Sequence, residues 1–230
     1  MYPGGSPKKI KGRMKMKKKR ILSAAGFIAL FILWTAAIKC FDVQSIGPGG
    51  SAVGFAALNG FVHELFGVHM LLYIVTDWLG IVPLCFVLGF AVLGLIQLIK
   101  RKSLFKVDSD ILALGGFYVA VLAVYFLLET VVINYRPVLI DGHLEASYPS
   151  STTMLVMCVI PTAIMQFKVR IKNKLLQKII IFTLAAFTVF MVIGRLVSGV
   201  HWFTDIVGGA ILSAGLVTLY SGISGTKNHI

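Results

Sequence analysis

The sequence predicts an all-α integral membrane protein with six transmembrane helices and one further helix in the outer membrane interface. Apolar residues make up 57% of its 230 residues, and charged residues only 13%. The mean hydropathy is +0.89, far above what a soluble domain of this length needs to fill its core. The basic residues also gather in segments that six spans would place on one side of a membrane.

Six apolar runs have about the length needed to cross the roughly 30 Å hydrocarbon core of a bilayer. They cover residues 21–38, 70–99, 111–134, 152–167, 179–194 and 202–221. The second run is long and contains Asp77 and Pro83, so we expect it to be tilted or kinked. The fourth run is short, and we expect its flanks to lengthen it.

The distribution of Lys and Arg predicts which side is cytoplasmic. Nine of these residues precede the first span, four lie at 100–106, five at 168–178 and one in the C-terminal tail. Six spans place these segments, with 19 of the 22 basic residues, on one side, which the positive-inside rule assigns to the cytoplasm. Both termini are therefore predicted to be cytoplasmic. The outer side keeps only Lys39, Arg136 and Arg195.

The segment KKIKGRMKMKKKR, Lys8 to Arg20, is the most basic part of the chain. Such a block could bind nucleic acid or begin a cleaved signal peptide, but the apolar run after it is long enough to span. We therefore interpret it as a cytoplasmic arm attracted to anionic lipid headgroups and expect no nucleic-acid partner. The three cysteines lack the spacing of a zinc site or a disulfide framework and are interpreted as packing residues.

The segment Gly49 to His69 is predicted to be an amphipathic helix in the outer interface. Its glycines and polar residues oppose a spanning helix, whereas its apolar residues follow helical spacing: Phe55, Leu58, Val62, Leu65 and Phe66. If this segment crossed the membrane, every later loop would change sides and the distribution of basic residues would no longer agree with the topology.

Three polar patches meet on the predicted outer side: NYRPVLIDGH (134–143), SYPSSTT (147–153) and GRLVSGVHWFTDIVGG (194–209). Two of them hold the outer arginines, whose guanidinium forks suit a phosphate group. The patch at 147–153 opens a helix, and free backbone N–H groups at a helix start bind anions. The predicted phosphate-binding residues are Arg136, Arg195, Ser150, Ser151 and Thr152.

His201 and Asp205 are predicted to be the catalytic pair. Their i, i+4 spacing puts them on one face of a helix, where the carboxylate can accept from Nδ1–H and leave Nε2 free as a nucleophile or base. Each residue has a structural alternative: Arg195 could snorkel, His201 could anchor the interface, and Ser150 could simply cap a helix. Their conjunction on one face favours a functional site.

At these residues the chain resembles the type-2 phosphatidic acid phosphatase family, whose helical-bundle fold is shared with vanadium haloperoxidases. The resemblance covers roughly residues 50–221. The family patches K-x6-R-P, P-S-G-H and S-R-x5-H-x3-D are matched by Arg136-Pro137, Pro149-Ser150 and Arg195-x5-His201-x3-Asp205. The resemblance implies a membrane phosphatase in which His201 attacks phosphorus to form a phosphohistidine and Asp205 orients it. It implies that Arg136, Arg195 and Ser150 hold the phosphoryl oxygens.

Three positions depart from the family pattern: Glu129 replaces a lysine, Gly194 a serine and Thr152 the second histidine. We expect Glu129 to pair with an arginine or to stay protonated. The change at Thr152 matters most, because the matching family histidine protonates the leaving group and a hydroxyl is too weak an acid for that role. His143, in the outer loop, is a candidate replacement acid, although a solvated loop histidine is the simpler interpretation.

The missing acid predicts the substrate class. An alkoxide leaving group needs a proton, whereas a phosphate leaving from a diphosphate is already a stable anion. The sequence therefore favours a polyprenyl diphosphate over phosphatidic acid as substrate. We expect a lipid phosphatase at the outer face of the cell membrane that needs no cofactor or metal, because no span shows clustered His and carboxylate ligands.

Two alternatives stay open: a non-catalytic relative that binds or moves a phospholipid headgroup, and a lipid phosphotransferase. An oriented nucleophile favours an enzyme over the first alternative, but the motifs do not separate hydrolysis from transfer. The predicted organisation is a basic arm (1–20), a first transmembrane helix with an outer loop (21–48), a membrane phosphatase-like domain (49–221) and a cytoplasmic tail (222–230).

Overall fold

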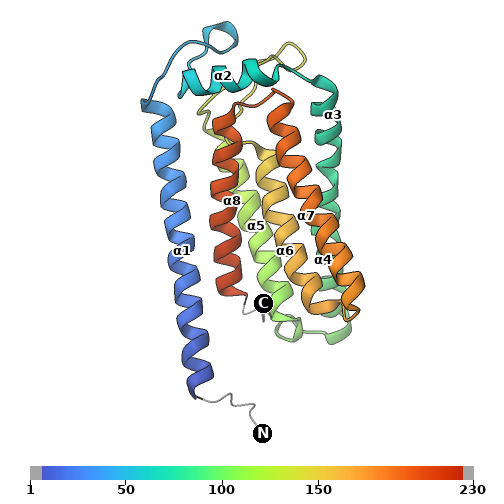
Figure 1. Cartoon of the computed structure of the whole chain (residues 1–230). Coiled ribbons are helices and arrows are strands. Elements are labelled where there is room, and N and C mark those ends of the chain that lie inside the picture. Colours follow the sequence, from blue (N-terminus) through green and yellow to red (C-terminus); the bar gives the residue numbers. More distant parts are fainter. Residues whose placement is uncertain (1–6, 225–230) are drawn as a thin grey trace.

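The computed structural model describes residues 7–224. It contains six helical segments long and apolar enough to cross a membrane, and they run side by side as a bundle (Figure 1). The spans are α1 (Pro7–Cys40), α3 with α4 (Met70–Leu79 and Ile81–Arg101), α5 (Ser109–Thr130), α6 (Ser151–Arg170), α7 (Lys174–Val197) and α8 (Phe203–Ile223). The predicted all-α fold with six spans is confirmed.

Helix α1 extends well beyond the predicted first span. It begins at Pro7 and continues through the basic segment without a break, so this part of the arm is a helical extension of the span. Lysine and methionine have good helix propensity, which accounts for the continuity. Residues 1–6 of the predicted arm and 225–230 of the predicted tail, including Lys227, lie outside the described residues.

The second span, for which the sequence predicts a tilt or a kink, is interrupted at Gly80. The N–H of Gly80 donates to both Thr76 O (3.2 Å) and Asp77 O (2.9 Å), and helix α4 begins at the next residue. Pro83 has no N–H to offer to the carbonyl of Leu79, so a regular hydrogen-bond ladder cannot cross this point. The break ends α3 one turn after Thr76.

The interfacial helix is shorter than predicted. Helix α2 (Ala56–Phe66) lies crosswise over one end of the bundle (Figure 1), while residues before it form the 3-10 turn η1 (Pro48–Gly50) and an antiparallel bridge between Gln44 and Val53. Buried Asn59 fastens α2 to the start of α8, because its amide donates to Thr204 Oγ1 (3.0 Å) and accepts from Thr204 N (3.2 Å).

Tyr148 anchors the long α5–α6 loop in the bundle. Its ring lies against α8 at Gly208, where an added Cβ would lie 2.4 Å from Tyr148 Cε2. Its hydroxyl shares a 2.7 Å hydrogen bond with Thr35 Oγ1 of α1, and its ring stacks on Phe31. The residues on either side of Tyr148 are thereby held over the end of α8.

Helix α5 ends at Thr130, before the predicted end of the third span at 134. From Asn134 the backbone pairs with residues 145–147 instead, through Ser147 N to Asn134 O (2.9 Å) and Arg136 N to Glu145 O (3.0 Å). The chain therefore leaves the helix early and enters a loop closed by these bonds.

The two ends of the bundle differ in charge as the sequence predicts. The start of α1, the α4–α5 and α6–α7 connections and the end of α8 share one end, while α2, the α5–α6 loop and the α7–α8 turn share the other (Figure 1). The end that holds the start of α1 and the α4–α5 and α6–α7 connections carries the basic segments.

We expect the end that carries α2 to face outward. A single cysteine at Leu144, which is 40% exposed, should react with an impermeant maleimide added to intact cells once the exposed Cys40 and Cys85 are replaced. A matched cysteine at exposed Lys172 in the α6–α7 connection should react only after permeabilisation. The reverse labelling pattern would overturn the predicted orientation.

Candidate active site

The three polar patches come together at the end of the bundle that carries α2. Arg195, in the last turn of α7, places Nη2 3.1 Å from Nε2 of His201. Arg136, in the α5–α6 loop, places Nη1 3.5 Å from the same nitrogen. Side chains that are far apart in the sequence thus converge on Nε2 of His201.

The α7–α8 turn is held tightly against the turn before α3. Gly199 has a φ of +70°, and a Cβ there would lie 2.0 Å from Gly67 O. The N–H of His69 donates to Ser198 O (3.0 Å) across the same contact. Only glycine fits this conformation and this approach, and the contact fixes the path of the chain into His201.

Ser147 lies between His201 and Asp205, which corrects the predicted direct contact. The distance from His201 Nδ1 to Asp205 Oδ2 is 3.9 Å, too long for a hydrogen bond. Ser147 Oγ donates to Asp205 Oδ2 at 2.5 Å and lies 3.0 Å from Nδ1. Because its hydrogen is committed to the carboxylate, Ser147 Oγ accepts from Nδ1–H, which leaves the lone pair on Nε2.

Asp205 is itself oriented by the first turn of α8. Its Oδ2 accepts from the backbone N–H of Trp202 (2.9 Å), and Oδ1 lies 3.5 Å from the Asn134 amide nitrogen. The carboxylate is fully buried, so these donors, with Ser147, supply the hydrogen bonds that such a group needs.

His201 is held in its neutral form. The pKa of its imidazole is lowered well below the ordinary value, first by burial and then by the positive charges of Arg195 and Arg136, while the bond to Ser147 acts in the opposite direction. A histidine with a lowered pKa is unprotonated at neutral pH, so Nε2 is available as a nucleophile.

Arg195 is buried without the hydrogen-bond acceptors that a guanidinium ordinarily has. It is 1% exposed, its guanidinium lies 4.8 Å from the Tyr73 ring centroid, and Nη1 lies 3.5 Å from Asp77 Oδ1. Among the described residues, neither Nε nor Nη1 has a hydrogen-bond partner. Unpaired donors on a buried cation beside a nucleophilic nitrogen suit an anion that accepts from them.

Ser150, Ser151 and Thr152 form the start of α6, as predicted. Ser150 is the N-cap, accepts from Thr153 N (3.4 Å) and donates its own N–H to Asp205 O (3.2 Å). Ser151 and Thr152 are half-buried in the first turn, where backbone N–H groups have no acceptor within the helix. The predicted phosphate-binding residues therefore lie around the same end of the bundle.

His143 is not brought into this cluster. It is exposed in the α5–α6 loop, and its backbone pairs with that of Ile140. Within residues 7–224, none of the side-chain hydrogen bonds or ion pairs joins His143 to His201 or to either arginine. The structure gives no support to His143 as the replacement acid.

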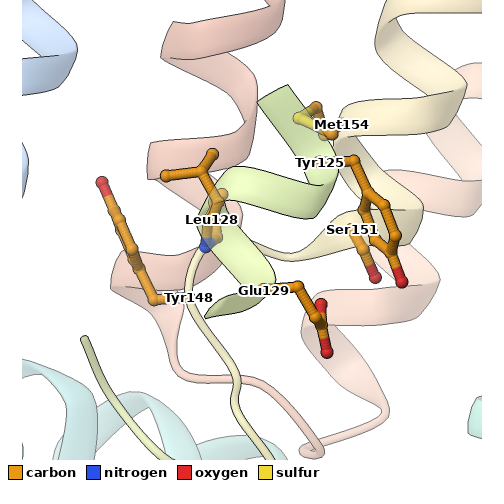
Figure 2. Close-up of a pocket in the computed structure, with 7 residues that line it drawn as sticks. Tyr125, Leu128, Glu129, Tyr148, Ser151 and Met154 are labelled. Carbon is orange, nitrogen blue, oxygen red and sulfur yellow. The ribbon is translucent and has the colours of Figure 1, made fainter. Parts of the chain in front are cut away.

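Glu129 forms no ion pair with an arginine among the described residues, so the first of its two expected states is wrong. It is exposed at the end of α5 and lines a small pocket with Tyr125 and Ser151 (Figure 2). Arg136 instead forms an ion pair with Glu145, whose Oε2 lies 3.0 Å from Nε. None of the ion pairs within residues 7–224 involves Glu129.

The glycine that replaces the family serine is required by packing. A Cβ at Gly194 would lie 2.8 Å from Thr76 Cγ2, and Thr76 is held by hydrogen bonds from Oγ1 to Leu72 O and Tyr73 O. We expect Gly194→Ser to destabilise the protein by about 1–3 kcal/mol, as overpacking does, which a lower thermal unfolding midpoint in detergent would show.

The matched control is Thr76→Ser, which removes Cγ2 and keeps the hydroxyl. In the double variant with Gly194→Ser, stability should return toward that of Thr76→Ser alone. Equal midpoints for Gly194→Ser and the parent would show that the contact does not restrict this position.

The sequence predicted the three patches, but it did not predict the contacts that Ser147 makes with His201 or that Tyr73 and Asp77 make with Arg195. Ser147 opens the second patch, yet nothing in its spacing indicates a bridge between two other side chains. Tyr73 carries no signal in an apolar run. Asp77 did carry one, since an ionisable residue within a span is by default a functional candidate.

Comparison with known proteins agrees with this fold. Residues 131–228 match the model of the PAP2 superfamily. The crystal structure of a transmembrane PAP2-type phosphatidylglycerolphosphate phosphatase from Bacillus subtilis is similar in fold, with a TM-score of 0.64. The match covers 90% of this chain and 98% of that one, at 18% identity. No curated protein gives a significant sequence match.

Proposed function

We propose, from the match of residues 131–228 to the PAP2 superfamily model and from the PAP2-like fold, that this chain is a membrane lipid phosphatase that works through a phosphohistidine at His201. One observation carries the proposal: the unprotonated Nε2 of His201 lies within 3.1 and 3.5 Å of two arginines. A nucleophile enclosed by guanidinium donors is what transfer of a phosphoryl group requires.

In the first step, Nε2 attacks phosphorus and the bond from phosphorus to the leaving oxygen breaks. Arg136, Arg195 and the N–H groups at the start of α6 hold the phosphoryl oxygens as their charge develops. The imidazole becomes positively charged, and the Nδ1–H to Ser147 to Asp205 chain stabilises that charge. In the second step, water attacks phosphorus, the bond to Nε2 breaks and inorganic phosphate leaves.

A cavity beside this site supports a lipid substrate. It has a volume of about 360 Å³, and Ser151, Thr152 and Asp77 lie on its lining. The rest of its wall is largely apolar, with Ile81, Leu84, Val121, Leu122 and Leu155 contributing from α4, α5 and α6. An apolar cavity next to a phosphate site suits a lipid chain, and Thr152 in the acid position favours a polyprenyl diphosphate at the outer membrane face.

The decisive experiment is a phosphate-release assay on the purified protein in detergent. We expect polyprenyl diphosphate to be hydrolysed faster than phosphatidic acid. EDTA should have little effect, because residues 7–224 hold no cluster of three or more His, Cys, Asp or Glu side chains that could bind a metal ion.

Three results would contradict parts of this proposal. Strong inhibition by EDTA would indicate a metal-dependent site. Transfer of labelled phosphate to an added alcohol in preference to water would indicate a phosphotransferase. No release from any lipid phosphate would favour a non-catalytic relative that binds a headgroup. Glu129 in place of the family lysine would not prevent such binding.

A further inference from the structure

Asp77 lies at the end of α3, one turn before the break at Gly80. Its Oδ1 is 3.5 Å from Nη1 of Arg195, whose Nη2 in turn contacts His201 Nε2 at 3.1 Å. One guanidinium therefore touches both the Asp77 carboxylate and the nucleophile. The Asp77 side chain is 58% exposed, so the packing of the bundle does not enclose it.

The Asp77 carboxylate also shares the cavity of about 360 Å³ with Thr152. An added Cβ at Gly80 would lie 3.9 Å from Thr152 Cγ2, so the break in the second span packs directly beside the start of α6. The close approach of Thr76 to Gly194 holds this part of α3 against α7. Asp77 thus lies beside Thr152, the position at which this chain lacks the proton-transferring histidine of the family.

Three other carboxylates at this end of the bundle are placed differently. Glu145 lies on the far side of Arg136, in contact with Nε. Glu129 lines the smaller pocket in Figure 2 and has no ion pair with either arginine among the described residues. Asp205 is fully buried behind Ser147. Asp77 alone among these four lines the larger cavity.

Hydrolysis of a phosphohistidine requires a group that accepts a proton from water. Cleavage of a diphosphate needs no proton on its leaving group, but the second step has water as the nucleophile. A threonine hydroxyl cannot accept that proton at neutral pH, whereas a carboxylate can, and such a base contributes typically about 10²–10⁴-fold.

We propose that Asp77 is the general base that activates this water, a role that rests on the proposed phosphohistidine mechanism. Water oxygen forms a bond to phosphorus, the bond from phosphorus to Nε2 breaks, and its electron pair returns to Nε2. The proton released by water goes to the Asp77 carboxylate and then to solvent. Arg195 holds the phosphoryl group between the two side chains.

The test is rapid-quench analysis of Asp77→Asn with polyprenyl diphosphate labelled in the terminal phosphate. The first step needs no base, so labelled phosphohistidine should form and accumulate at His201. The second step should slow, and steady-state turnover should fall by about 10²–10⁴-fold. Glu129→Gln, which removes a carboxylate from the neighbouring pocket, is the matched control and should behave like the parent.

A purely structural role would give a different result. If Asp77 only positions Arg195, Asp77→Asn should lose phosphohistidine formation and turnover together, which would overturn the proposal, as would unchanged turnover. Adding formate to Asp77→Ala should restore hydrolysis and discharge the accumulated phosphohistidine, and failure of formate to do so would also count against it. If the parent forms no phosphohistidine and releases no phosphate, the proposed function itself is wrong.

Discussion

His201→Ala should abolish phosphate release from every lipid substrate, with a fall of up to about 10⁶-fold, as when other covalent nucleophiles are removed. The reason is that Nε2 is the nucleophilic atom in contact with the guanidinium groups of Arg136 and Arg195. The lowered pKa of His201 keeps that nitrogen unprotonated at neutral pH. The measurement is steady-state release of phosphate, together with loss of labelled phosphohistidine.

Two matched variants test the orientation of the ring. Ser147→Ala removes the hydroxyl between His201 and Asp205, and Asp205→Asn removes the charge behind it. Both should fold and both should reduce the rate, and their effects should not add, because they act through one hydrogen-bonded chain. Full activity in Ser147→Ala would show that Asp205 acts directly on Nδ1. Full activity in His201→Ala would refute the phosphohistidine mechanism.

Thr152→His should change which lipids are hydrolysed. The parent is expected to prefer a diphosphate, because the site has no acid to protonate an alkoxide. A histidine at 152 restores such an acid and should raise monoester hydrolysis by up to about 10²–10⁴-fold, while diphosphate hydrolysis gains much less. Thr152 lines the cavity of about 360 Å³, which gives a larger side chain room. The measurement is the ratio of kcat/KM for polyprenyl diphosphate and phosphatidic acid.

The outcomes separate the possible proton donors. If the parent already hydrolyses both lipids equally well, another residue supplies the proton. Loss of phosphohistidine formation from the monoester, but not from the diphosphate, in Asp77→Asn would then assign that role to the carboxylate beside Arg195, and the same loss in His143→Ala would assign it to the exposed loop histidine. If Thr152→His gains no monoester activity, the family acid position does not control substrate choice in this chain.

The sequence by itself determined the membrane architecture. Hydropathy reports the cost of burying each segment in hydrocarbon, and this cost depends on composition more than on neighbours. The six spans could therefore be predicted, although helix α1 begins well before its predicted span. The same is true of the crosswise helix α2, whose polar residues exclude a span. Topology then predicted that Arg136, Ser150, Arg195 and His201 meet at one end of the bundle, because consecutive spans alternate in direction.

Only the tertiary structure decided how these side chains touch. Spacing on a helix predicted a direct contact between His201 and Asp205, but His201 lies before α8, and the 3.9 Å gap is bridged by Ser147 from a different segment. The position of that serine depends on Tyr148 packing against Gly208. The approach of Asp77 to Arg195 depends likewise on Thr76 packing against Gly194. Such contacts join segments far apart in the chain, and packing at the scale of single atoms sets them, which hydrophobic periodicity cannot predict.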